Sequence, residues 1–139
     1  MDFYLFLCNK DSVRYFPTNR PSNFTINLEN SNLCIEGQWE VAITDISVFL
    51  EFRKEKPRWL IITSDICEAS YCGGRHIQIL RRIPVPARAE RYSETFSTRY
   101  YFKVTAFAFK SVNIRILNED LDTAELGGDI AVTLHLKKV

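Results

Sequence analysis

Histidine is scarce in this sequence, and its scarcity restricts the chemistry open to the protein. His76 and His135 are the only two histidines among 139 residues. A cupin-like metalloenzyme holds its metal with several histidines that face a barrel interior, so two histidines argue against that class. His135 falls on the polar phase of an alternating segment, which predicts a strand residue exposed to solvent. We therefore expect no catalytic residue, no cofactor and no bound metal.

The nearest approach to a metal motif lies between Cys67 and His76. Together with Cys72, these residues could supply three zinc ligands within ten positions. Structural zinc sites usually show two paired knuckles, and only one loose pair is present here. Ordinary buried or loop cysteines are therefore the better interpretation. We expect free thiols, as in a reducing compartment, at Cys8, Cys34, Cys67 and Cys72.

A strong charge of either sign is also missing. The 18 basic and 17 acidic residues leave a formal net charge of +1. A protein whose main task is to bind the nucleic-acid backbone needs a concentrated basic surface, so we expect nucleic-acid contact to be incidental. A near-zero balance also removes long-range repulsion between copies, and this permits self-association.

Long apolar runs and phosphate-binding glycine loops are absent too. No segment approaches the roughly 20 apolar residues of a membrane-spanning helix, so we expect no membrane span. Residues 1–7 lack a basic leader and a small-residue cleavage site, and they predict a strand instead of a signal peptide. This pattern indicates synthesis in the cytosol. The pairs Gly73-Gly74 and Gly127-Gly128 are isolated and are typical of turns.

Alternation of apolar and polar residues dominates the rest of the chain. In Asn23-Phe24-Thr25-Ile26-Asn27-Leu28 the alternation is strict, as in a strand with one buried face. Other segments are richer in apolar, β-branched and aromatic residues. Together they predict about eight strands, at residues 3–8, 23–28, 39–43, 59–66, 77–83, 100–109, 112–116 and 130–136.

Short strands joined by very unequal connections indicate a two-sheet sandwich. Proline-rich turns separate the strands, and residues 86–97 lack a period and predict a long charged connection. We expect an all-β, eight-stranded antiparallel jelly-roll sandwich in a single domain, residues 1–139. An immunoglobulin-like sandwich ranks second, because its Cys–Trp–Cys pattern is not convincing here. The predicted core comprises Phe24, Ile26, Leu28, Trp39, Val41, Ile43, Trp59, Val132 and Leu134.

A cluster of arginines and aromatic residues is the best candidate for an interaction surface. Three consecutive aromatics at residues 100–102 place rings on both faces of a strand, so at least one reaches an edge, a pocket or an interface. The arginines are either contact residues or a solvated loop balanced by Glu90 and Glu94. The predicted subunit interface comprises Arg81, Arg82, Arg88, Arg91, Tyr100, Tyr101 and Phe102.

Several blocks of the sequence, in order along the chain, resemble one known family. In the first half they are Phe3-Tyr4-Leu5-Phe6-Leu7, residues 15–19, residues 24–28 and residues 35–46. In the second half they are residues 60–66, 80–85 and 109–116, the last leading into residues 132–136. The most specific block is Gly37-Gln38-Trp39-Glu40-Val41. These blocks resemble the minor capsid, or penton, proteins of Maverick/Polinton elements and the related adintoviruses.

The resemblance implies a single jelly roll that forms a five-fold ring at the vertices of an icosahedral virion. Its implied partners are further copies of itself and a major capsid protein of the double jelly-roll type. It implies synthesis in the host cytosol, with the host nucleus as a possible place of assembly. One departure is a short link between Ile46 and Trp59, where the family carries a long middle section.

A second reading of the same sandwich remains open. It is a binding module for a carbohydrate or a receptor, which would be monomeric or trimeric and would carry an aromatic-lined pocket. Fold alone does not decide between the two readings.

Overall fold

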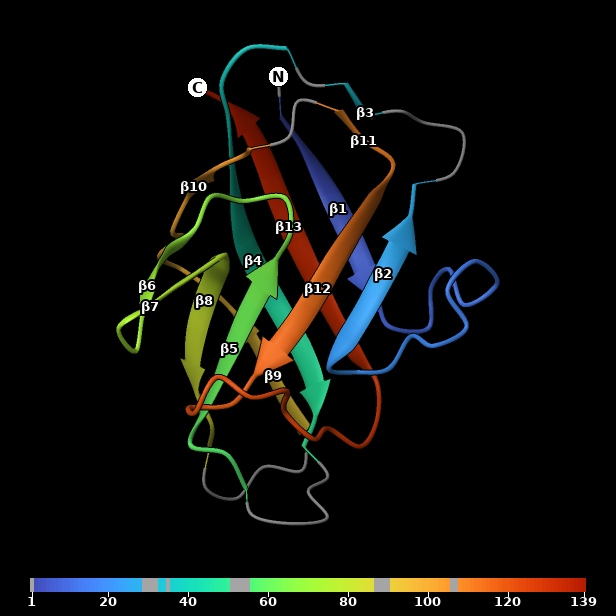
Figure 1. Cartoon of the computed structure of the whole chain (residues 1–139), viewed down its shortest axis with the longest axis vertical. Helices are drawn as coiled ribbons and strands as arrows, with labels where there is room; N and C mark the ends of the chain where they lie inside the picture. Colours follow the sequence, from blue (N-terminus) through green and yellow to red (C-terminus); the bar gives the residue numbers. More distant parts are fainter. Residues whose placement is uncertain (1, 29–32, 35, 51–55, 87–90, 106–107) are drawn as a thin grey trace.

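Two antiparallel β-sheets pack face to face and enclose the core (Figure 1). The structure is a computed structural model, and it describes residues 2–28, 33–34, 36–50, 56–86, 91–105 and 108–139. Sheet I has the strand order β1-β13-β4-β10, and β9 also pairs with β4. Sheet II has the order β2-β12-β5-β8. Two small ribbons, β3 with β11 and β6 with β7, complete the strands of the described residues.

The strands of five residues or more build the two sheets. They are β1 (Asp2–Cys8), β2 (Asn23–Asn27), β4 (Trp39–Phe49), β5 (Trp59–Ser64), β8 (Ile79–Pro84), β9 (Arg91–Thr95), β12 (Ser111–Leu117) and β13 (Ile130–Lys138). The shorter strands are β3 (Leu33–Cys34), β6 (Ser70–Cys72), β7 (Arg75–Ile77), β10 (Phe102–Lys103) and β11 (Ala108–Phe109). The described residues therefore hold thirteen strands, more than the eight expected.

The connection of the strands is that of a jelly roll. The chain passes from β1 in sheet I to β2 in sheet II, back to β4, and on to β5 and β8 in sheet II. It then returns to β9 in sheet I, crosses to β12 in sheet II and ends with β13 in sheet I. Neighbours within each sheet thus come from distant parts of the chain, as in a double Greek key. The predicted all-β jelly-roll sandwich is confirmed.

The core lies between the sheets because each strand turns its apolar residues inward. In β12, Val112, Ile114 and Ile116 are fully buried, and the residues between them point away from the core. Leu28 is partly buried against the same cluster. The residues predicted for the core that are buried are Phe24, Ile26, Trp39, Val41, Ile43, Val132 and Leu134.

The prediction of a core position for Trp59 is wrong. Strand period places Leu60 and Ile62 of β5 inside, so Trp59 and Ile61 must face outward. Trp59 is half-buried on the outer face of sheet II, with the Arg82 guanidinium 4.5 Å from its ring centre. Both phases of this run are apolar, so alternation does not show which of them faces inward. Ile61 joins a small second cluster on that outer face.

A β-bulge lies within β4, and it explains why the strand extends beyond the segment predicted from the alternation of apolar and polar residues. The pairing of β4 with β13 shifts by one residue at Thr44. Odd-numbered residues up to Ile43 face the core, and even-numbered residues from Ile46 onward do so. An extra residue of this kind reverses the side-chain phase without ending the strand. The strand therefore continues to Phe49, past the expected end at Ile43.

Two other segments differ from the expected strands. Residues 91–95, expected within a long connection, form β9 and pair with the end of β4. Only Tyr92 of β9 is partly buried, so this edge strand shows no apolar alternation. The segment 100–109, expected as one strand, divides into β10 and β11 because β10 pairs with β4 and β11 pairs with β3.

Candidate interaction surface

The arginines of the predicted interface lie in separate places. The Arg81 guanidinium lies 4.1 Å from the ring centre of Phe96 and 4.4 Å from that of Tyr100. Its Nη1 donates a hydrogen bond of 2.6 Å to the carbonyl oxygen of Thr98. Arg81 thus binds the strand β8 to the segment that follows β9. It supports Tyr100, whose side chain is 53% exposed.

Arg82 and Arg91 project from different faces. Arg82 covers Trp59 on the outer face of sheet II, at 4.5 Å. Arg91 begins β9 and lies 5.7 Å from the ring centre of Phe49. Both arginines are exposed, so their charges remain available to a neighbouring molecule. Arg88 falls in residues 87–90, outside the residues that the structure describes.

The two remaining aromatics of the predicted interface face opposite sides of sheet I. Phe102 pairs with Val41 and packs against the core cluster. Tyr101 lies over the outer face of sheet I, where its hydroxyl is 2.8 Å from His135 Nδ1. The Lys137 ammonium lies 3.9 Å from the ring centre of Tyr101, a cation–π contact.

His135 is buried, and the prediction that it is exposed to solvent is wrong. It occupies the outward phase of β13, but Tyr4 stacks on its ring at 4.6 Å and Tyr101 meets it edge-on at 5.9 Å. Its side chain is only 7% exposed. Nε2 lies 2.8 Å from Asp2 Oδ2. A neutral imidazole satisfies both neighbours if Nε2–H donates to Asp2 and Nδ1 accepts from the Tyr101 hydroxyl.

The electrostatics of this cluster follow from the same contacts. The hydrogen bond from His135 is the main reason that the pKa of Asp2 is lowered from its usual value. The pKa of Arg99 is raised, chiefly by its hydrogen bond with Tyr101 and then by that with Tyr4. The outer face of sheet I thus holds aromatic rings together with the charged side chains of Asp2, Arg99 and Lys137.

A row of aromatic side chains crosses this outer face, and sequence reasoning did not single it out. We call Phe6, Tyr4, His135 and Tyr101 the aromatic strip. Tyr4 is 46% exposed and Phe6 is 75% exposed. Their rings stack at 6.3 Å. The signal was available in β1, since inward-facing residues at positions 3, 5 and 7 require Tyr4 and Phe6 to face outward.

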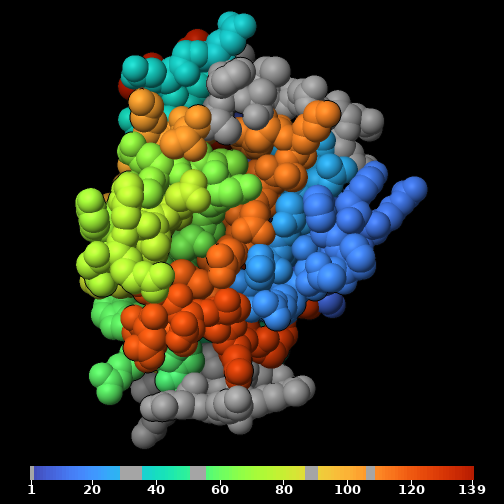
Figure 2. All heavy atoms as spheres, in the orientation of Figure 1, coloured from blue at the N-terminus to red at the C-terminus, as the bar shows by residue number. Residues whose placement is uncertain are grey.

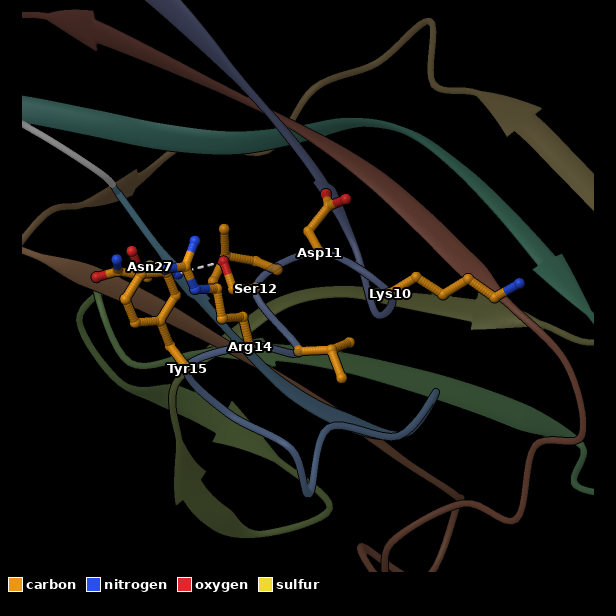
Figure 3. Close-up of a pocket in the computed structure, with 8 residues that line it drawn as sticks. Lys10, Asp11, Ser12, Arg14, Tyr15 and Asn27 are labelled. Atoms are coloured by element: carbon orange, nitrogen blue, oxygen red, sulfur yellow. Dashed lines mark hydrogen bonds between the residues drawn. The ribbon is translucent and has the colours of Figure 1, made fainter.

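The two edge strands on this side of the sandwich differ in how they are protected. The Asn19 side chain acts as a partner for β2, because Nδ2 donates to the Thr25 carbonyl at 2.8 Å and Oδ1 accepts the Thr25 N–H at 2.9 Å. The Asn27 N–H donates to Ser12 Oγ at 2.9 Å (Figure 3). Among the described residues, no backbone hydrogen bond joins residues 3–7 of β1 to a segment other than β13. β1 is therefore the open edge, and open edges are templates for association.

The residues once considered for zinc do not meet. The Cys67 thiol is buried 3.5 Å from the Ser64 carbonyl oxygen, and burial raises its pKa to about 12. Cys72 lies in the outer cluster of sheet II, and His76 is exposed and stacked on Tyr71. Within the described ranges, no three histidine, cysteine, aspartate or glutamate side chains gather as a metal site.

The same ranges contain no helix of the length and apolar character needed to cross a bilayer.

The contact between Asp2 and His135 predicts an acid-sensitive stability. Because the pKa of Asp2 is lowered in the folded state, its stabilising effect is present above the usual value of 3.8 and disappears as pH falls through the lower, folded value. Asp2→Asn should therefore lower the melting temperature at neutral pH, and the two proteins should converge below pH 3.8. Thermal melts followed by circular dichroism would measure this. A difference that stays constant with pH would instead indicate a loss of packing.

Comparison with known proteins adds one decisive likeness. No protein-family model matches the chain, and no curated protein matches its sequence. Among solved structures, the crystal structure of the mavirus penton protein is similar over 100% of both chains, with a TM-score of 0.66 and 9% sequence identity. The chain has the fold of this penton protein. At 9% sequence identity, the similarity is one of backbone fold.

Within this penton fold, the exposed features fall on two faces. The aromatic strip and the open edge of β1 belong to sheet I, and the surface of sheet II carries Arg82 and Trp59. The β1–β2 connection projects beside β2, as the blue surface of Figure 2 shows. These faces are available to neighbouring molecules.

Proposed function

We propose that this protein is a structural capsid protein, the penton subunit that forms a homopentameric ring at the vertices of an icosahedral virion. The observation that carries this proposal is the similarity to the mavirus penton protein along the full length of both chains. The blocks that resemble the Maverick/Polinton and adintovirus pentons support the same function. We propose no catalytic role.

A ring requires a contact between two different patches on each copy, since the same rotation must carry every subunit onto the next. The aromatic strip supplies one such patch, because Phe6 and Tyr4 expose apolar rings next to the open edge of β1. Apolar aromatics and arginines are the side chains enriched at protein contacts. We propose that Tyr100, held by Arg81 of β8, is the centre of the complementary patch. Arg82 on the face of sheet II and Arg91 on the face of sheet I would border it from opposite sides.

The remaining residues of the predicted interface would support or border the two contact patches. Arg81 holds Tyr100 in place, and Phe102 anchors its strand in the core. Tyr101 would present its ring edge within the aromatic strip. Each stable contact should bury on the order of 1,200–2,000 Å². The net charge of +1 adds little repulsion between the five copies.

We further propose that the ring lies among trimers of a double jelly-roll major capsid protein. In this setting the protein would be located at the capsid vertex of a virus or element of the Polinton and adintovirus type. It would be made in the host cytosol, with the cytosol or the nucleus as the place of assembly. Nucleic-acid contact would be incidental, given the balanced charge.

The native mass of the purified protein tests the ring. Light scattering after size exclusion, at several concentrations, should show a species near five times the subunit mass of 16.2 kDa. Electron microscopy of the same fraction should show five-fold rings. A stable trimer at every concentration would contradict the ring and favour a binding module. A monomer at every concentration would show that this contact does not close a ring without other capsid proteins.

A further inference from the structure

A polar cleft of about 500 Å³ lies on the side of the molecule away from the aromatic strip. It is formed by the β1–β2 connection and by outward-facing side chains of β2 and β12 in sheet II. Its volume falls within the range of small-molecule sites, roughly 300–1,000 Å³. All but one of the residues that line it are polar, and none of them is a carboxylate. The exception is the aromatic ring of Phe16.

The amides of the cleft are locked in one orientation. Asn113 Nδ2 donates to Asn23 Oδ1 at 3.0 Å and to the Phe24 carbonyl oxygen at 3.2 Å. Both of these partners accept only, so the NH2 group of Asn113 must face them and its Oδ1 must face elsewhere. Asn23 in turn has its oxygen engaged and its NH2 group directed away. A hydrogen-bond acceptor and a donor are thereby left on the wall of the cleft.

The rest of the wall is held rigid by the edge of β2. Asn19 is fixed by its two hydrogen bonds to the backbone of Thr25. The Thr25 hydroxyl oxygen lies 3.0 Å from Asn113 Nδ2, whose two protons are shared among three acceptors, and the Thr25 proton is free to donate. Thr18 adds a second hydroxyl. Groups that are already ordered bind a ligand at a smaller cost in conformational entropy.

Arg20 supplies the only charge in the cleft. Its backbone is held by two hydrogen bonds with Asn23, at 3.2 and 3.1 Å. Its guanidinium has no hydrogen bond, ion pair or ring contact with the part of the chain that the structure describes. A guanidinium matches a carboxylate with two parallel hydrogen bonds. The cleft is therefore suited to an anionic group that also carries hydroxyls.

We propose that this cleft binds a carboxylated sugar of the sialic-acid or uronic-acid class. Arg20 would bind the carboxylate, and the amides and hydroxyls would exchange hydrogen bonds with the sugar hydroxyls, which both donate and accept. Phe16 would pack against the apolar C–H face of the ring. An inorganic sulfate fits less well, because it carries no proton that could be donated to the Asn113 oxygen. The inference extends the proposed function from assembly to recognition of a glycan, and it does not require the ring.

Direct titration tests this site. N-acetylneuraminic acid and glucuronic acid are added separately to the wild-type chain, with glucose as the neutral comparison, and binding is followed by ligand-observed NMR and calorimetry. We expect one of the two acids to bind and glucose to bind far more weakly. Arg20→Ala should weaken binding of the acid roughly 10- to 100-fold, the usual effect of losing a charged hydrogen bond.

Arg14→Ala is the matched control, because it removes the same charge from the same connection. Arg14 lies over Tyr15 in the neighbouring cleft (Figure 3). Its loss should leave sugar binding unchanged. The proposal is overturned if neither acid binds the wild type, if glucose binds equally well, or if both arginine variants weaken binding equally. The same samples report their native mass, so a failure of the glycan site is distinguishable from a failure of the ring.

Discussion

Trp39→Ala should lower the free energy of unfolding by about 3–5 kcal/mol, the usual cost of removing a buried large aromatic side chain. Trp39 is 8% exposed and packs against Phe3, with ring centres 5.5 Å apart. Its Nε1–H donates to the Glu36 carbonyl oxygen at 2.9 Å. Alanine would leave a cavity between the sheets and a carbonyl without its donor. Urea unfolding followed by fluorescence or circular dichroism would measure the change.

Trp59→Ala is the control for this prediction, because it removes the same side chain from the outer face of sheet II. Trp59 is half-buried there, with the Arg82 guanidinium over its ring, so the loss should be smaller, about 1–2 kcal/mol. The comparison depends only on which side of a sheet each tryptophan occupies. Equal losses at the two positions would show that Trp59 contributes to the core after all, contrary to its position in the structure.

Phe6→Glu should abolish the pentameric ring while leaving the fold intact. Phe6 is 75% exposed on the outer face of sheet I, so a charge there meets water in the monomer. In the ring that we propose, the same carboxylate would be buried among aromatic side chains. Loss of a central aromatic contact typically costs about 2–4 kcal/mol, and burial of an uncompensated charge adds to it. Light scattering should then show the monomer.

Tyr71→Glu is the matched control for the ring. Tyr71 is 80% exposed, but it belongs to the β6–β7 hairpin that lies over sheet II. Its replacement introduces the same charge at an exposed aromatic and should leave the mass of the assembly unchanged. If Phe6→Glu still forms the ring, the aromatic strip is not the contact. If Tyr71→Glu alone dissociates it, the β6–β7 hairpin and not the aromatic strip is the contact.

The arrangement of the interaction surface could be predicted only in part. Tyr100 is exposed, as an interface residue should be, but Phe102 faces the core. The sequence places both in one apolar run, and three aromatics in succession do not show which phase faces inward. The exposure of Phe6 could have been deduced from the alternation of β1. The arginines were close in sequence, yet the structure places Arg82 and Arg91 apart because β8 and β9 belong to different sheets.

The burial of His135 depended on residues distant in the sequence. The alternation correctly places His135 on the outer face of β13. A residue on the outer face of a sheet can still be covered by other side chains. Tyr4 comes from the first strand and Tyr101 from the segment before β10, and both cover the imidazole. The polar cleft also depends on residues distant in the sequence, since Asn113 and Asn19 come together only when β2 and β12 pair.

The sequence by itself determined the fold class and most of the core. When only one face of a strand is buried, strict alternation allows a single orientation, with the apolar residues toward the core. Phe24, Ile26 and Val132 could therefore be placed in the core from the sequence. Tertiary structure decided what alternation does not encode: the phase of runs that are apolar on both faces, the bulge at Thr44, and the polar edge strand β9. It also decided which surface residues become neighbours. Those outcomes depend on contacts between distant strands, which local periodicity cannot specify.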